Sequence, residues 1–331
     1  METTSSTGTL TNILAPVSDW IDRGNRRLND IAVQENDTVL GAILNFAIDA
    51  SGKRVRPAAV FLSHALFHQA DARAVDLAAA TECLHSATLV HDDIVDEAES
   101  RRGRDTVHMS WSTGVAVLAG DYLFASAASL VGGLNDPRIM TLFADTIMRI
   151  SRSEFDNPTY GPDAEQLMAD YLAKIEGKTA SLFGLCCEAA AVLAGGTKDQ
   201  QRDLREYGLS LGNAFQIADD VLDVIGDPDI TGKAVGGDLE RGLLTAPTIH
   251  FLQIPGSANS VVAQFLNESD PNTEELAAAL MELKHSGAID QARSDAARFG
   301  NQAREHLASF PDGPYTRALE ALTYYVVNRT R

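Results

Sequence analysis

Two long proline-free stretches dominate the pattern of apolar and polar positions along the chain. One lies between Pro57 and Pro137, the other lies between Pro162 and Pro228, and both are rich in Ala and Leu. Ala and Leu are strong helix formers, whereas a proline inside a helix costs about 3 kcal/mol, so such stretches are typical of helices joined by short loops. Alternating strand patterns are scarce. The pattern therefore predicts an all-α fold, with residues 1–331 as one domain.

Two segments of this pattern are distinct enough to be assigned to single helices. Residues 163–194 are expected to form one helix, which Gly195 and Gly196 would end. Residues 114–134 form the most apolar run of the chain. Because Asp121 interrupts this run and small residues dilute it, we expect a buried helix rather than a membrane span.

Composition narrows the class of protein. The 331 residues are 45% hydrophobic, which is enough for one large core or two modest domains. The formal net charge of −19 argues against a protein that binds nucleic acid or anionic membranes, and an anionic substrate would need a local cationic pocket. The three cysteines include the adjacent pair Cys186 and Cys187, and the first residues lack a signal-peptide pattern. We therefore expect no disulfide framework and a cytoplasmic location.

Two aspartate clusters share the spacing D-D-x-x-D. They are Asp92, Asp93 and Asp96, and Asp219, Asp220 and Asp223. On a helix, the first and last aspartates of each cluster lie on one face, where their like charges repel. Apolar residues flank both clusters, so the carboxylates need a cation, and Mg²⁺, which bridges carboxylates to substrate phosphates, fits best. The alternative is that both clusters are solvated acidic helix turns. Two identical clusters on apolar helices disfavour this alternative.

Basic residues that could hold phosphate occur at four places. These are Lys53, Arg54 and Arg56, then Arg101 and Arg102, then Lys178 beside Thr179, and finally Lys233. Each alone could be a surface loop, and they gain meaning as a set. No P-loop and no G-x-G-x-x-G occurs, so nucleotide-binding functions lack support. His85 lies two turns before Asp92, where it could equally be a core histidine.

In this order, the motifs resemble those of the trans (E-type) isoprenyl diphosphate synthases over residues 52–247. The matching residues are Gly52-Lys53-Arg54-x-Arg56-Pro57, His85 with His91-Asp92-Asp93-x-x-Asp96, Arg101-Arg102-Gly103, Gly120-Asp121, Lys178-Thr179, Phe215-Gln216-x-x-Asp219-Asp220-x-x-Asp223 and Gly232-Lys233. The resemblance implies a single helical bundle around a central cavity, usually a homodimer. It also implies a prenyltransferase that joins isopentenyl diphosphate to an allylic diphosphate such as farnesyl or geranylgeranyl diphosphate.

The resemblance also implies roles for these residues, position by position. The clamp on isopentenyl diphosphate would be Lys53, Arg56, His85 and Arg102. The allylic diphosphate would be held by Arg101, Lys178, Thr179, Gln216 and Lys233. The main magnesium ligands would be Asp92, Asp96 and Asp219, supported by Asp93, Asp220 and Asp223, with three ions present once substrate is bound.

This chain departs from the family pattern at two positions. Asp105 precedes Thr106 where the family often has proline, and Leu243 occupies the position of the usual second lysine in G-K-x-T-L-P. One contact to the allylic diphosphate is therefore missing. Two other kinds of protein remain as alternatives. A terpene cyclase commonly lacks the second D-D-x-x-D cluster, which this chain has. A non-catalytic partner subunit should have lost some of the aspartates or of the clamp residues, and this chain keeps both sets.

Residues one helical turn before Asp92 bear on the length of the product, because the growing chain should pass beside them. Ala87 and Thr88 are small, and the next turn offers Cys83 and Leu84, none of them aromatic. Short-chain members of the family commonly place an aromatic ring there, and one turn rises about 5.4 Å, close to one isoprene unit. We therefore expect a product longer than geranylgeranyl diphosphate, with possible transient membrane contact. In the alternative, a short-chain synthase, Ala87 merely packs against a neighbouring helix.

Overall fold

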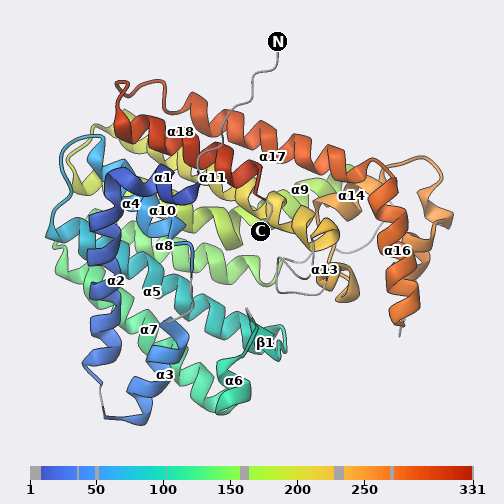
Figure 1. The fold of residues 1–331 in the computed structure, drawn as a ribbon, viewed down its shortest axis with the longest axis horizontal. Coiled ribbons are helices and arrows are strands. Elements are labelled where there is room, and N and C mark those ends of the chain that lie inside the picture. Colours follow the sequence, from blue (N-terminus) through green and yellow to red (C-terminus); the bar gives the residue numbers. More distant parts are fainter. Residues whose placement is uncertain are drawn as a thin grey trace.

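The computed structural model describes residues 9–35, 37–48, 52–101, 103–156, 164–226, 235–268 and 272–329. In these segments the chain is almost entirely helical (Figure 1). Strands there are confined to one antiparallel hairpin, β1 (Ser100–Arg101) with β2 (Arg104–Asp105). The predicted all-α class is confirmed, and the assignment of residues 1–331 to one domain stays a prediction.

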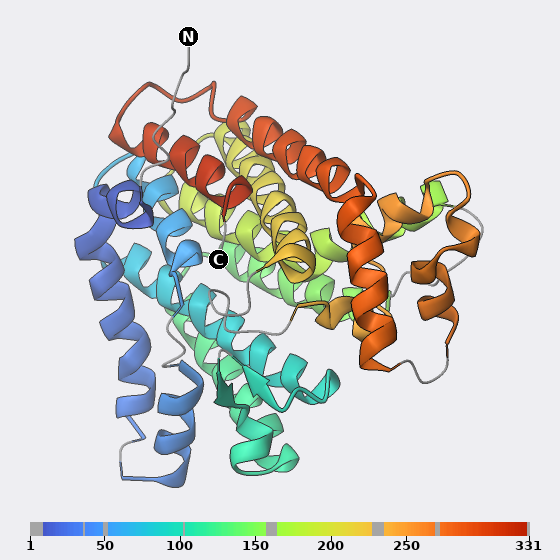
Figure 2. The same cartoon turned by 45° about the vertical axis from the view of Figure 1, so that its right-hand side comes forward.

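The helices follow one another with short connections, and Figures 1 and 2 show most of them side by side in one bundle. The first half of the chain contains α1 (Leu10–Leu14), η1 (Ala15–Val17), α2 (Ser18–Val33), α3 (Val39–Ile48), α4 (Val55–Ala65), α5 (Ala72–Val95), α6 (Val107–Ser110), α7 (Thr113–Gly133) and α8 (Pro137–Ser153). The second half contains α9 (Ala164–Ile175), η2 (Glu176–Ala180), α10 (Ser181–Leu193), α11 (Lys198–Ile225), α13 (Gly237–Glu240), α14 (Ala246–Leu252), η3 (Ser257–Asn259), α15 (Val261–Asn267), α16 (Thr273–His285), α17 (Ala288–Glu305) and α18 (Pro314–Val327).

Helix α10 lies at the centre of the bundle. All of its residues except Glu188 are buried, because a helix that is apolar on every side can only be stable when other helices surround it. It packs against α4, α5, α8 and α11, and α5 in turn packs against α7. Amphipathic α2 and α8 bury one face each and lie further out.

Helix α11 connects two hydrophobic cores. Residues of its first half, such as Leu204 and Leu211, belong to the core of the main bundle. Ile217 and Val221, from its second half, belong to a smaller core that α9 and α14–α17 complete. The second aspartate cluster therefore lies on α11 where the two cores meet.

The segment predicted as one helix over residues 163–194 differs from that expectation. Within its described part, α9 ends at Ile175, η2 forms a turn of π-helix, and α10 starts at Ser181. A π turn inserts an extra residue into the helix and is frequent at functional sites. The predicted end is confirmed: Gly195 has φ = +76°, and the N–H of Gly196 donates to the carbonyl of Ala191 at 2.9 Å, as in a Schellman motif.

Helix α7 is less buried than the sequence suggested. It packs one face against α5, whereas Val117 and Leu118 are exposed. By length and composition alone, α7 is the one helix of the described segments that is long and apolar enough to cross a membrane. Partly buried helices of water-soluble cores pass the same test, so length and composition do not make α7 a membrane span.

Candidate active site

Both aspartate clusters lie at the carboxyl ends of long helices. Helix α5 ends at Val95 with Asp96 as its cap, and Asp223 lies in the last turn of α11. The carbonyl groups at such an end carry a partial negative charge, to which each cluster adds carboxylates. These two helix ends therefore need cations more strongly than the sequence spacing alone indicated.

In the first cluster, Asp92 and Asp96 contact different cations. The carboxylate of Asp92 lies 3.8 Å from the ammonium of Lys178, which also contacts Glu154 at 2.8 Å. Burial raises the pKa of Asp92 to about 6, although Lys178 opposes the shift. Asp96 accepts from the guanidinium of Arg241 at 3.1 Å.

Asp93 contacts a different cation. Its side chain is buried and accepts from Nε of Arg101 on β1 at 2.7 Å. Burial raises the pKa of Asp93, and the guanidinium of Arg101 opposes that rise. The hairpin of β1 and β2 thus provides the cation that allows Asp93 to be buried.

The second cluster has a similar division of its aspartates. Asp219 is paired with Arg329 near the carboxyl end of the chain. Asp220 is buried and accepts from the hydroxyl of Tyr171 at 2.5 Å and from the amide of Gln216 at 2.9 Å. Burial, with the nearby charge of Asp238, raises the pKa of Asp220 well above its usual value. In both clusters, therefore, the first aspartate is more accessible and the second is held inside.

Two bridges connect the clusters. On one side Arg241 joins Asp96 to Asp238, and the backbone N–H of Asp238 donates to the carboxylate of Asp223 at 3.1 Å. On the other side, Lys178 lies beside Asp92. The next residue, Thr179, donates to Gln216 at 2.8 Å. The structure thus brings the two clusters, which are more than 120 residues apart in sequence, into one site.

The π turn and two glycines position Lys178 and Thr179. A Cβ atom on Gly212 would lie 2.4 Å from the Cα atom of Ala180, and one on Gly208 would lie 2.4 Å from the carbonyl oxygen of Phe183. Only glycine allows α11 to approach the start of α10 so closely. This approach places the hydroxyl of Thr179 within reach of α11.

The cations expected on the isopentenyl side lie over aromatic rings. Lys53 lies 5.8 Å from the ring centre of Tyr325, and Arg56 lies 4.8 Å from that of Phe183. The ring of Phe183 contacts that of Phe215, over which the guanidinium of Arg329 lies at 4.3 Å. A continuous row of rings and guanidinium groups therefore runs from the start of α4 to Asp219.

Some residues of the site were not predicted from the sequence, and two predicted ones cannot be placed. Arg102 and Lys233 lie outside the described residues. His85 is partly buried, seven residues before Asp92 on α5. The residues that sequence reasoning missed are Glu154, Tyr171, Asp238, Arg241 and Arg329. Only Arg241 carried a signal, since it lies two positions before Leu243, where a lysine was expected.

The residues proposed to set product length divide between two faces of α5. The thiol of Cys83 donates to the carbonyl of Leu123 at 3.2 Å, and the ring of His91 lies 3.1 Å from the carbonyl of Val117. Ala87 lies midway between Cys83 and His91 on the same face, so it points toward α7, where it is fully buried. Thr88 and Leu84 lie nearer the face of Asp92.

No three His, Cys, Asp or Glu side chains converge to form a preassembled metal site in the part of the chain that the structure describes. Mg²⁺ uses one or two carboxylates and takes its other ligands from water and substrate phosphates. The ammonium and guanidinium groups beside Asp92, Asp96 and Asp219 occupy positions where a divalent cation would be stabilised. The donor set therefore fits magnesium.

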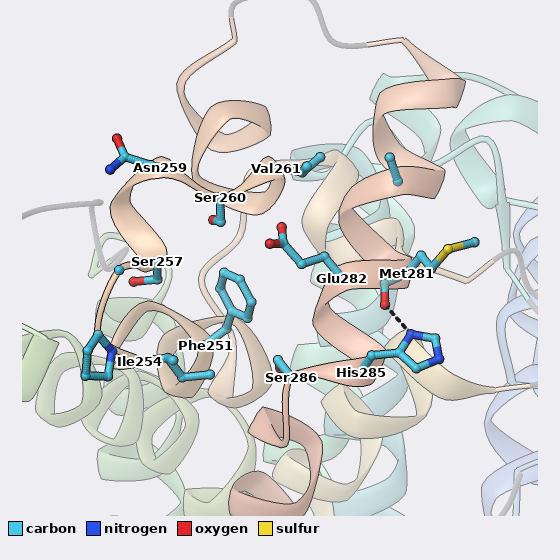
Figure 3. A pocket seen from close by; sticks show the side chains of 13 residues that line it. Phe251, Ile254, Ser257, Asn259, Ser260, Val261, Met281, Glu282, His285 and Ser286 are labelled. Carbon is cyan, nitrogen blue, oxygen red and sulfur yellow. Dashed lines mark hydrogen bonds between the residues drawn. The ribbon is translucent and has the colours of Figure 1, made fainter.

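A surface pocket of about 790 Å³ lies elsewhere, between α14, η3 and α16 (Figure 3). Apolar side chains such as Phe251, Ile254 and Met281 contribute to its lining. None of the residues predicted from the sequence lines this pocket. The candidate active site is therefore the pair of aspartate clusters.

Comparisons with known proteins identify the family of this chain. A family model of polyprenyl synthetase matches residues 37–283, which include both clusters. A nonaprenyl diphosphate synthase of Mycobacterium tuberculosis is 36% identical over 304 residues, covering 92% of this chain and 90% of that protein. The crystal structure of a polyprenyl synthase from Caulobacter crescentus, complexed with calcium and isoprenyl diphosphate, has a TM-score of 0.91 at 31% identity, covering 98% of this chain and 99% of that one. The crystal structure of a decaprenyl diphosphate synthase from Rhodobacter capsulatus has a TM-score of 0.88 at 31% identity, covering 98% of this chain and 100% of that one. The chain belongs to the polyprenyl synthetase family.

Proposed function

We propose that this protein condenses isopentenyl diphosphate with an allylic diphosphate, head to tail, and releases pyrophosphate. The product would be a trans polyprenyl diphosphate longer than geranylgeranyl diphosphate. One observation carries the proposal: two D-D-x-x-D clusters lie at the ends of α5 and α11, connected by Lys178, Thr179 and Arg241. The similarity to a nonaprenyl and a decaprenyl diphosphate synthase supports the long product.

The accessible carboxylates of Asp92, Asp96, Asp219 and Asp223 would hold magnesium. When bound, magnesium would neutralise the charge that develops on the departing diphosphate. The calcium and isoprenyl diphosphate in the Caulobacter crescentus structure support a site for divalent cations and diphosphate. The number of three ions stays a prediction. Asp93 and Asp220 would act as positioning residues, because their carboxylates are already held by Arg101 and by Tyr171 with Gln216.

The remaining polar side chains would hold the two diphosphates. Lys178, with Thr179 and Gln216, lies between the clusters and would contact the allylic diphosphate. Lys53 and Arg56, at the start of α4, would bind isopentenyl diphosphate together with His85. Charge-assisted bonds from such groups stabilise negative charge more strongly than neutral donors do.

We infer that the protein forms a homodimer through α7 and α8. The exposed face of α7 includes Val117 and Leu118, and Asp121 is the helix's single charged residue. Helix α8 packs against α7 and brings the exposed apolar side chain of Met148, and Phe155 just beyond α8 is 88% exposed. A second copy that brings the same surface would bury these side chains. Light scattering of the Leu118→Glu variant tests this: the wild type should be a dimer and the variant a monomer.

One assay tests the proposed reaction. Purified protein is incubated with magnesium, isopentenyl diphosphate and farnesyl or geranylgeranyl diphosphate, and products are identified by mass. Prenyl diphosphates longer than twenty carbons support the proposal. Cyclised hydrocarbon would indicate a terpene cyclase, absence of turnover would indicate a non-catalytic subunit, and a product of fifteen or twenty carbons would indicate a short-chain synthase. A cytoplasmic location and a transient membrane contact of the product stay predictions.

A further inference from the structure

The turn between α13 and α14 contains an arginine near the position of the missing lysine. The sequence there is Glu240-Arg241-Gly242-Leu243, and Leu243 brings no charge. We propose that Arg241 binds the allylic diphosphate and supplies the positive charge that Leu243 does not. This inference rests on the proposed function and assigns one further binding residue to the same site.

Hydrogen bonds connect this turn, through α13, to the second cluster. The backbone N–H of Gly236 donates to the carbonyl of Asp223 at 2.7 Å, and that of Asp238 donates to the Asp223 carboxylate at 3.1 Å. The N–H of Leu243 donates to the carbonyl of Asp238 at 2.8 Å. Arg241 and Leu243 therefore belong to one compact turn, whose position is set by the end of α11.

The guanidinium of Arg241 reaches across to the first cluster. Its Nε donates to the carbonyl of Gly237 at 3.2 Å, Nη2 to Asp238 at 2.9 Å and Nη1 to Asp96 at 3.1 Å. Two of these acceptors lie on α13, just before the turn, whereas Asp96 is a proposed magnesium ligand at the end of α5. The contacts with α13 keep the side chain aimed at the site even when Asp96 is used otherwise.

Divalent cations that arrive with a diphosphate would compete with Arg241 for the carboxylate of Asp96. The Nη1 group would then lose its carboxylate partner, and a diphosphate oxygen is the matching acceptor. Guanidinium presents five N–H donors in a planar fork that suits phosphate oxygens, and three atoms of this fork are already oriented. The side chain is 44% exposed, so a ligand can reach it. Lys174 on α9 is a second cation of this region: burial lowers its pKa, and the nearby charges of Asp96 and Asp238 oppose that shift.

A purely structural role for Arg241, tying α13 to α5, makes different predictions. If Arg241 only connects α13 to α5, its removal lowers the stability of the protein and weakens the binding of both substrates equally. If it contacts the diphosphate, its removal weakens the binding of the allylic substrate alone, and a cation elsewhere in the turn restores that binding. Leu243→Lys offers such a cation. The variants needed are therefore Arg241→Ala, Leu243→Lys and the double variant.

The matched control is Arg298→Ala. Arg298 is 48% exposed and pairs with Asp295 three residues earlier at 3.0 Å, much as Arg241 pairs with Asp238, but it lies on α17 outside both clusters. Calorimetry with farnesyl thiodiphosphate, an unreactive allylic analogue, and with inorganic pyrophosphate would measure Kd in the presence of magnesium. KM for each substrate and Tm of each variant complete the comparison.

We expect Arg241→Ala to weaken binding of the analogue by about tenfold, the loss of one charge-assisted bond at a partly exposed site. KM for the allylic substrate should rise similarly, while KM for isopentenyl diphosphate stays within about twofold. The double variant should regain most of the lost affinity, and Arg298→Ala should bind the analogue as the wild type does.

Unchanged binding by Arg241→Ala, equal effects on both substrates, or no recovery in the double variant would overturn the inference. If the wild type shows no prenyl transfer, the proposed function fails, and binding of pyrophosphate still decides the role of Arg241.

Discussion

The ends of α5 and α11 carry the same five-residue spacing and have different surroundings. At the end of α5, the inner aspartate, Asp93, is paired with a guanidinium from the adjacent hairpin. At the end of α11, the donors to the inner aspartate, Asp220, within the described residues are the neutral groups of Tyr171 and Gln216, and the pKa of Asp220 rises well above its usual value because it is buried. Identical spacing thus gives one buried ion pair and one buried acid held by neutral groups.

The accessible aspartates differ as well. Asp92 lies beside a lysine from the neighbouring π turn, whereas Asp219 is paired with Arg329 from beyond α18. The first arrangement depends on helices that are packed into the main core. The second depends on a residue close to the end of the chain. The motif thus determines where carboxylates lie, and the surrounding helices determine which of them face a ligand.

The largest expected effect is on turnover, and it should be alike in both regions. Asp92→Ala and Asp219→Ala should each lower kcat by about 100-fold or more, because charge stabilisation in the transition state usually contributes the most to catalysis. Circular dichroism should remain that of the wild type. Asp290→Ala, an exposed aspartate on α17, is the control and should retain activity. Turnover near that of the wild type in either cluster variant would contradict a metal role.

The second expected effect is on product length, and only the α5 region should show it. Ala87→Phe places a ring between α5 and α7, where Ala87 is fully buried. We expect the growing tail to run along this face of α5, so the ring should shorten the product to farnesyl or geranylgeranyl diphosphate. A product of unchanged length would mean that Ala87 only packs against α7. Thr88→Phe, one residue later and nearer the face of Asp92, is the matched comparison and should affect KM more than length. Mass analysis of products decides this. Shortening by Thr88→Phe alone would move the wall to the face of Asp92.

The third expected effect is on stability and should differ between the two regions. Arg101→Ala leaves the buried carboxylate of Asp93 without its counter-ion, and we expect a loss of about 3 kcal/mol in the free energy of unfolding. Tyr171→Phe removes one neutral hydrogen bond from Asp220, and we expect a loss of about 1 kcal/mol. Urea unfolding without ligands measures both. Equal losses would mean that the two inner aspartates are held in equivalent ways.

The smallest expected effect is a shift in Tm on ligand binding, which needs both regions. Magnesium together with farnesyl thiodiphosphate should raise Tm by about 5 °C, whereas each alone should raise it by less than about 2 °C. The reason is that the diphosphate and the metal neutralise each other and the charges of both clusters. Asp219→Asn should abolish the extra shift. If the separate shifts simply add, metal and diphosphate do not share a site.

Several features of the fold and site followed from the sequence. Proline-free stretches rich in Ala and Leu predicted helices, and the glycine pair at 195 and 196 correctly predicted the end of α10. The spacing of the aspartates predicted two acidic clusters on helices, and the structure has them at the ends of α5 and α11. Local interactions decide these features, because helix propensity, capping and i,i+4 neighbours involve residues close together along the chain.

Other features were decided by the tertiary structure alone. The π turn in the segment predicted as one helix depends on how closely α11 approaches the start of α10, and the sequence of that segment gives no sign of it. The sequence also could not tell which aspartate of each cluster is held inside, since that depends on Arg101, Tyr171 and Gln216. The pairs between Arg241 and Asp96 and between Arg329 and Asp219 join residues 145 and 110 positions apart. Such pairs form only after helices distant in sequence have packed, and the physical reason is that burying a carboxylate is costly until the fold brings a cation or a hydrogen-bond donor to it.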